Sequence, residues 1–229
     1  TKLDKNGRIP FPTILSLDGK PLAMAVGSIE TNSKPTLAVI LEQDNRRVLV
    51  TRTADEKTRT QKLSESFKSN PSAMAIHDVN QDGLPDLVVL VPYEKIKVLL
   101  QVPGKSFEEV DVIPPGGTVD QPWLSIADVD GDGKPELLLA QKNFLRAAVL
   151  KSDTQNKGTT ARPEWAFIVK EQINGASGNS RIVGATPIRN GTNQTSSLFL
   201  LDAERKALTL SERDSAGVWQ VVRNISLPV

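Results

Sequence analysis

Short apolar runs separated by polar turns recur along the chain and predict β-strands rather than helices. Residues 86–90 read Asp-Leu-Val-Val-Leu, and residues 136–140 read Glu-Leu-Leu-Leu-Ala. Runs of this length, bounded by turn residues, are typical of buried strands. No stretch has a helical period long enough to compete with this pattern. We therefore expect an all-β chain.

The strand pattern repeats with a period of fifty residues. Pro35, Pro85 and Pro135 occupy equivalent positions, and the apolar runs around them align without gaps through three units. A fourth unit follows after a shift of sixty, and the polar segment 152–163 accounts for the ten extra residues. Each unit is expected to hold four strands: about 72–78, 86–92, 95–102 and 106–113 in the second, and about 122–128, 136–141, 144–151 and 164–172 in the third.

Four strands per repeat of this length are the pattern of a β-propeller blade. A lone four-stranded sheet leaves both faces uncovered, so that neighbouring blades must stack to bury them. We expect four-stranded antiparallel blades at about 17–67, 68–115, 116–174 and 175–229, with residues 8–16 as the outer strand of a preceding blade. The chain would then be a segment of a larger propeller, completed by further sequence or by another subunit. A self-contained four-bladed ring is the alternative.

Two acidic loops in the same frame point to metal binding. In the first, the side chains at loop positions 1, 3, 5 and 9 are Asp78, Asn80, Asp82 and Asp86, and position 6 is Gly83. The same positions of the second loop hold Asp128, Asp130, Asp132, Glu136 and Gly133. Alternate oxygen ligands with a glycine at the sharp turn are the beginning of a calcium loop.

The charge density of these loops favours a cation. Carboxylates about 4 Å apart repel by roughly 4 kcal/mol per pair at an effective dielectric of about 20. Ligands that are all oxygens select a hard ion, and calcium accepts irregular geometry more readily than magnesium. An Asx-turn, in which Asp and Asn bond their own backbone, is the alternative for either loop. An EF-hand does not fit, because Val89 and Leu139 stand where its bidentate Glu is required and the flanks are strands.

These loops resemble the FG-GAP/VCBS repeats of integrin alpha-subunit heads and of many secreted bacterial proteins. The resemblance rests on Asp-Val-Asn-Gln-Asp-Gly-Leu-Pro-Asp at 78–86 and Asp-Val-Asp-Gly-Asp-Gly-Lys-Pro-Glu at 128–136. It implies about seven blades and a calcium ion in each intact loop. The implied ligands of the two ions are the side chains already named, with the backbone carbonyls of Leu84 and Lys134.

The first and fourth repeats lack this ligand set. The five key positions of the first repeat hold a single carboxylate, Glu30, and no glycine. With the shift of sixty, the fourth repeat has Ile188 at position 1 and no carboxylate at any of the five positions. Two calcium sites are therefore expected, both in the middle repeats.

Composition excludes several classes of function. The chain has 28 basic and 27 acidic residues, a net charge of +1 and no cysteine. The balanced charge gives no footprint for nucleic acid, and no apolar stretch approaches the ~20 residues of a membrane helix. Weak calcium loops work at about millimolar calcium, which favours an extracytoplasmic location, secreted, periplasmic or at the cell surface.

No set of nucleophile, base and orienting residue stands out, so we expect no catalytic residues and no further cofactor. The only histidine, His77, fits a packed strand residue. The predicted function is a calcium-stabilised scaffold that binds a protein partner or another subunit, with a glycan as the second partner class. The alternative is a secreted carbohydrate-active lyase or hydrolase, for which Glu30, Glu94, Asp111 and Asp120 are the acids to test.

Overall fold

The computed structural model describes residues 5–9, 11, 14–29, 34–67, 69–119, 121, 123–153, 164–188 and 197–228. This part of the chain contains no helix, and so none long and apolar enough to cross a membrane. The chain is all-β, which confirms the predicted fold class.

The strands of the described residues form four antiparallel sheets, each built from four strands that are consecutive in sequence. The first sheet contains β1 (Lys20–Gly27), β2 (Thr36–Gln43), β3 (Arg46–Thr53) and β4 (Thr58–Lys62), and the second contains β5 (Ala73–His77), β6 (Asp86–Leu90), β7 (Ile96–Leu100) and β8 (Glu108–Val112). The third contains β9 (Leu124–Ala127), β10 (Glu136–Gln141), β11 (Phe144–Asp153) and β12 (Glu164–Asn174), and the fourth contains β13 (Ile182–Ile188), β14 (Ser197–Asp202), β15 (Ala207–Arg213) and β16 (Trp219–Ser226).

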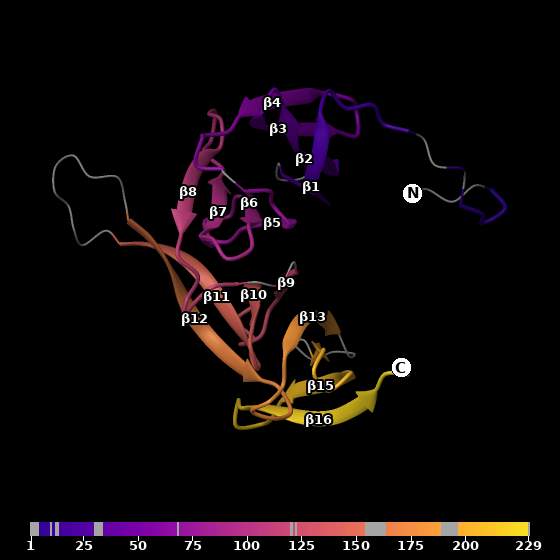
Figure 1. Cartoon of the computed structure of the whole chain (residues 1–229), viewed down its shortest axis with the longest axis vertical. Coiled ribbons are helices and arrows are strands. Elements are labelled where there is room, and N and C mark those ends of the chain that lie inside the picture. Colours follow the sequence, from indigo (N-terminus) through magenta and orange to yellow (C-terminus); the bar gives the residue numbers. More distant parts are fainter. Residues whose placement is uncertain are drawn as a thin grey trace.

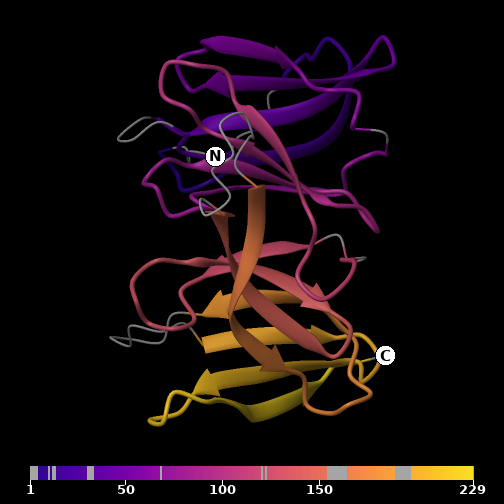
Figure 2. The ribbon, with the colours of Figure 1, turned by 90° about the vertical axis from the view of Figure 1, so that its left-hand side faces the viewer.

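The sheets are arranged like the blades of a propeller. The first strands of successive sheets contact one another, β1 with β5, β5 with β9 and β9 with β13. Figure 1 shows these strands on the inside of the arc and the fourth strands on its outside. Seen from the side, the sheets are stacked one upon another from the first to the fourth (Figure 2).

The core lies between the sheets. On β6, Leu87 and Val89 pack in a cluster with the first sheet, whereas Val88 and Leu90 pack in a cluster with the third. All five residues of β6 are buried, because the strand is covered on both faces. This explains why the middle strands read as continuous apolar runs rather than as alternating patterns.

The four sheets form an open arc and not a closed ring. The fourth sheet packs against the third, and no substantial contact joins its described residues to the first sheet. The self-contained four-bladed ring is therefore not the structure of this chain.

The N-terminal segment differs from the sequence prediction. The described residues of 8–16 are not in a strand, and none of them belongs to one of the four sheets. Leu15 and Leu17 instead line a pocket with Val39 and Leu41, on the face of the first sheet that points away from the second.

The fourth repeat is displaced by one position more than the sequence pattern predicted. Glu136 pairs with Ala127 in the third sheet, and Ser197 pairs with Ile188 in the fourth, so Glu136 corresponds to Ser197 and not to Ser196. Moving a strand by one position turns every side chain to the other face. Leu198 and Leu200 consequently pack against the third sheet, and Phe199 and Leu201 face away from it.

The tryptophans serve the contacts between sheets. Trp165 and Trp219 are partly buried against the clusters on either side of the third sheet. Trp123 is 56% exposed, yet a Cβ at Gly184 of the next sheet would meet its ring at 3.4 Å. Trp123 therefore lies against the backbone of the fourth sheet at ordinary van der Waals distance.

Candidate metal centre

The first acidic loop connects β5 to β6 in the second sheet. The Asp78 carboxylate accepts hydrogen bonds from the backbone N–H groups of Asp82 at 3.0 Å and Gly83 at 2.8 Å. Asn80 Nδ2 donates to Asp82 Oδ2 at 2.9 Å, and Asp82 Oδ1 accepts from the N–H of Leu84 at 2.8 Å. The bond from Leu84 to Asp82 is that of an Asx-turn, and together the four bonds hold the side chains of loop positions 1, 3 and 5 around one turn.

Asp86 closes the first loop from the start of β6. Its side chain is fully buried and accepts from the N–H of Val79 at 3.2 Å and of Gln101 at 2.9 Å. Burial raises the pKa of Asp86 to about 7, against the effect of these two hydrogen bonds, and the charges of Asp82 and Asp78 raise it further. Among the described side chains, no cation forms an ion pair with the acids of this loop that would offset these effects on the pKa of Asp86.

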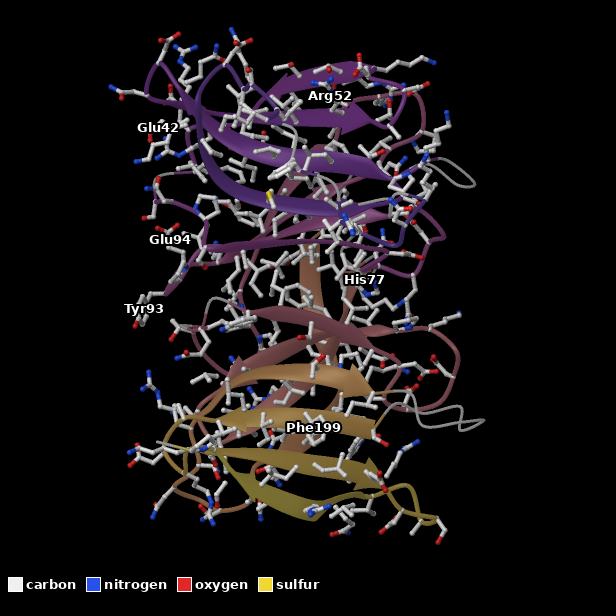
Figure 3. The ribbon with its side chains drawn as sticks, turned by 90° about the vertical axis from the view of Figure 1, so that its right-hand side faces the viewer. Glu42, Arg52, His77, Tyr93, Glu94 and Phe199 are labelled. Atoms are coloured by element: carbon white, nitrogen blue, oxygen red, sulfur yellow. The ribbon has the colours of Figure 1, made fainter. Side chains whose placement is uncertain are left out.

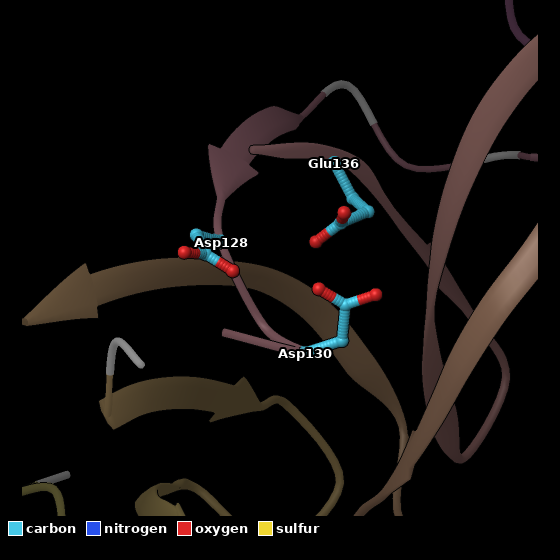
Figure 4. Close-up of side chains that lie close together, drawn as sticks. All are labelled: Asp128, Asp130 and Glu136. Carbon is cyan, nitrogen blue, oxygen red and sulfur yellow. The ribbon is translucent and has the colours of Figure 1, made fainter. Parts of the chain in front are cut away.

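The second loop, between β9 and β10, brings three carboxylates together. One oxygen each from Asp128, Asp130 and Glu136 lies within 4.8 Å of the other two, and Figure 4 shows the three groups converging. The Asp128 carboxylate accepts from the N–H groups of Gly131 at 2.7 Å and Gly133 at 3.0 Å. Glu136 has one methylene more than Asp86, and its carboxylate still reaches those of Asp128 and Asp130.

Glu136 has an unsatisfied oxygen. Its side chain is fully buried, Oε2 accepts from the N–H of Val129 at 3.0 Å, and Oε1 has no hydrogen-bond partner. Burial raises the pKa of Glu136 to about 7, and the charges of Asp130, Asp132 and Asp128 raise it further. Leaving a buried carboxylate oxygen unpaired costs roughly 1–3 kcal/mol or more. A divalent cation held by the three carboxylates would remove that cost, so the residues fit calcium.

The remaining predicted ligands include Leu84, Asp132 and Lys134, which belong to the turns of the two loops. Asp132 Oδ1 accepts from the N–H of Lys134 at 2.8 Å, as Asp82 does from Leu84. Asp132 is not among the three residues whose carboxylate oxygens cluster in the second loop. The turns thus place Leu84 and Lys134 at matching positions, with the N–H groups of both used inside the loop.

Three basic side chains from distant parts of the sequence also reach the loops. Lys170 Nζ lies 3.0 Å from Asp130 Oδ2, Arg213 donates to the Asp130 carbonyl at 2.6 Å, and Lys151 Nζ donates to the Asn80 carbonyl at 3.2 Å. Burial would raise the pKa of Asp130, but the hydrogen bond and the charge of Lys170 bring it below its ordinary value. These residues could not be found from the sequence, because each comes from another strand and no spacing links it to the loop.

The corresponding loops of the outer repeats fall largely outside the described residues. Glu30 lies there, and so do residues 189–196 of the fourth repeat. Because Ser197 corresponds to Glu136 at loop position 9, loop position 1 of the fourth repeat is Arg189 and not Ile188. The prediction that these two repeats bind no calcium stays a prediction.

Of the acids named for an enzyme, the two that the structure describes, Glu94 and Asp111, each have another partner and form no bond with the histidine. Glu94 follows β6 and His77 ends β5, and the two lie on opposite sides of the body in Figure 3. Glu94 accepts a hydrogen bond from Ser69, and Asp111 pairs with the buried Lys97 at 2.9 Å. Burial lowers the pKa of His77, as expected for a packed strand residue. Glu30 and Asp120 lie outside the described residues.

Comparison with known families agrees with the geometry of the two loops. No curated protein matches the chain. The model of the FG-GAP-like repeat matches residues 78–139, which begin at Asp78, the first predicted ligand of the first loop, and extend through the second loop into β10. The chain therefore carries an FG-GAP-like repeat, set among four-stranded antiparallel sheets that are consistent with β-propeller blades.

Proposed function

We propose that this chain is a calcium-stabilised, non-catalytic β-propeller segment that acts as a binding or scaffolding module in a larger extracytoplasmic assembly. The single observation that carries the calcium part is the buried, unpaired Oε1 of Glu136 beside two further carboxylates. Oxygen-only ligands and crowded negative charge match the preferences of calcium. Titration of the metal-free chain with calcium, followed by calorimetry, tests this part directly, and two binding events are expected.

In this proposal the ions act on stability. Each loop joins the innermost strand of a sheet to the second strand, and its last ligand, Asp86 or Glu136, is the first residue of that second strand. An ion at this position ties the loop to the buried part of the sheet. Because such loops bind weakly, at about 10⁻⁴ to 10⁻³ M in extracellular modules, the proposal includes a location where calcium is about millimolar.

The assembly part rests on an apolar sheet face that is repeated four times. In the first three sheets, the second strand turns two apolar side chains toward the next sheet, and the following sheet buries them. These pairs are Ala38 and Ile40, Val88 and Leu90, and Leu138 and Ala140. The register maps Leu138 and Ala140 onto Phe199 and Leu201 of the fourth sheet.

The fourth face has the same character but no cover. Phe199 pairs with Leu210 and Leu201 pairs with Leu208, as Leu138 pairs with Ala147 and Ala140 with Leu145. All four side chains are only partly buried, and Figure 3 places Phe199 on the fourth sheet at the end of the stack. We propose that a further sheet of the same repeat covers this face, because three faces of equivalent composition already bind such a sheet.

The 229 residues include no cysteine, so a single introduced cysteine can report whether this face is covered. Single variants Phe199→Cys and Val222→Cys are labelled with a thiol reagent, in the isolated chain and in the native assembly from its source. We expect Phe199→Cys to be labelled rapidly in isolation and at least about tenfold more slowly in the assembly. Val222, which is 56% exposed on the outer strand, serves as the control and should be labelled at a similar rate in both. Equal labelling of Phe199→Cys in both samples would contradict the proposed contact.

The partner class within this proposal is a protein or another subunit first, and a glycan second. The mixed surface charge, with a net charge of +1, supports neither nucleic acid nor an anionic membrane. The non-catalytic assignment is tested by screening the chain against glycans, since turnover of any of them would favour the lyase or hydrolase alternative.

A further inference from the structure

The two acidic loops differ in one respect that their sequences do not show. In the second loop, Lys170 Nζ lies 3.0 Å from Asp130 Oδ2 and 3.7 Å from Asp132 Oδ2. Both carboxylates are among the predicted calcium ligands. An ammonium group therefore already contacts the oxygens that a calcium ion would use.

A β-bulge directs Lys170 toward this loop. Ala147 of β11 pairs with Glu171 of β12, whereas the next residue, Ala148, pairs with Val169. Lys170 is thus the extra, unpaired residue, and bulges of this kind redirect a side chain at the point where the register slips. The bulge lies beside the loop end of β10, because Ala148 also pairs with Leu137, the residue after Glu136.

The second sheet has no equivalent of Lys170. Its outer strand β8 pairs with β7 in continuous register from Ile96–Val112 to Leu100–Glu108, so it has no extra residue to redirect. The lysine that does reach the first loop, Lys151, contacts the Asn80 carbonyl at 3.2 Å and Gln81 Oε1 at 3.3 Å, which are neutral oxygens. Among the described residues, no ion pair involves the carboxylates of the first loop.

We propose that Lys170 is a built-in competitor of the metal, so that the second loop binds calcium more weakly than it would without this lysine. This inference rests on the proposed calcium sites and adds a residue that lowers the affinity of one of them. Lys170 does not satisfy the whole cluster, because Oε1 of Glu136 remains unpaired. Binding of a cation to that oxygen would still be favourable.

Competition follows from the geometry of the two cations. Calcium takes its oxygen ligands at about 2.3–2.6 Å and needs several of them at once. It cannot bind Asp130 and Asp132 in this way while an ammonium group lies against both. Lys170 is 36% exposed and has a flexible stem, so its Nζ can move into water when calcium arrives. Calcium binding at the second loop therefore requires that two ion pairs be broken. No such ion pair is present among the described residues of the first loop.

The test isolates the second loop and removes the competing charge. In an Asp82→Ala background, which disables the first loop, we compare Lys170 with Lys170→Met and Lys170→Arg by calorimetric titration with calcium. Lys170→Met should bind about 3- to 30-fold more tightly, which corresponds to two partly exposed ion pairs that no longer need to be broken. Lys170→Arg keeps the charge and should stay near the original affinity.

A matched control uses the other lysine. Lys151→Met removes a cation that contacts only neutral oxygens of the first loop, and it should leave the affinity of the second loop unchanged. If Lys170→Met binds calcium no more tightly than the unmodified background, or if Lys170→Arg tightens binding as much as Lys170→Met, competition by the charge is wrong. If no protein in the series, including the wild type, binds calcium, the proposed function itself fails, and the two failures are thus distinguishable.

Discussion

Excess chelator is expected to lower the melting temperature of the chain by about 6–12 °C. A ligand present at about ten times its dissociation constant stabilises the folded state by about 1.4 kcal/mol per site, so two loops contribute about 3 kcal/mol. For a domain of about 150–250 residues, each 1 kcal/mol shifts the melting temperature by about 2–4 °C. The loss arises because the carboxylates around Asp86 and Glu136 would repel one another without the ion. Thermal melts followed by circular dichroism, with calcium and with chelator, measure the shift.

Two variants assign this shift to a loop. Asp82→Ala should remove the part of the chelator effect that comes from the first loop. With equal contributions from the two loops, this part is about half of the shift in melting temperature. Asp44→Asn replaces an exposed acid in the turn between β2 and β3, in the first sheet and outside both loops, and should leave the whole effect in place. Asn is chosen there because Asp44 has a positive φ of 50°, which Asn tolerates. A melting curve that excess chelator does not move would mean that the loops are turns without a structural ion.

Leu200→Ala is expected to cost about 2–5 kcal/mol in the free energy of unfolding, because truncation of a buried leucine leaves a cavity. Leu200 is fully buried in the cluster between the third and fourth sheets, with Leu138 and Ala140. Phe199→Ala should cost about 1 kcal/mol or less in the isolated chain, since little apolar contact is lost at an uncovered face. Phe199 is the larger side chain, but it faces away from the third sheet and is only partly buried. Urea unfolding of the two variants beside the wild type measures both costs.

This pair of variants also tests the register of the fourth sheet. If Glu136 corresponded to Ser196 instead of Ser197, Phe199 and Leu201 would face the third sheet and Leu200 would face away. The two costs would then be reversed. A greater loss for Phe199→Ala than for Leu200→Ala in the isolated chain would therefore contradict the pairing of Ser197 with Ile188.

The middle two sheets are where sequence reasoning was most accurate. The predicted strands at 86–92 and 136–141 correspond to β6, which begins at Asp86, and β10, which begins at Glu136. These strands were predictable because their signals are local: an apolar run is bounded by a turn with fixed residues, and the same turn occurs twice. The family match over 78–139 covers the same region.

The sequence predicted that the fourth unit forms strands, but it did not predict the register of those strands. Strand β14 is apolar on both faces, with leucines at 198, 200 and 201 and Phe199 among them. Moving such a strand by one position changes nothing in its composition, although it exchanges the two faces. Hydrogen-bond pairing with β13 and packing against the third sheet decide which face is buried.

Local sequence was enough to predict the strands of the middle two sheets, the repetition of a four-stranded unit and the two acidic loops, because the spacing of neighbouring residues controls each of them. Only the tertiary structure decided that the sheets form an open arc, that Phe199 faces outward, and that Lys170 reaches Asp130 while the first loop has no such partner. These features depend on contacts between strands far apart in sequence and on a single bulge. The physical reason is that strand register and inter-sheet packing, and not local preference, place those side chains.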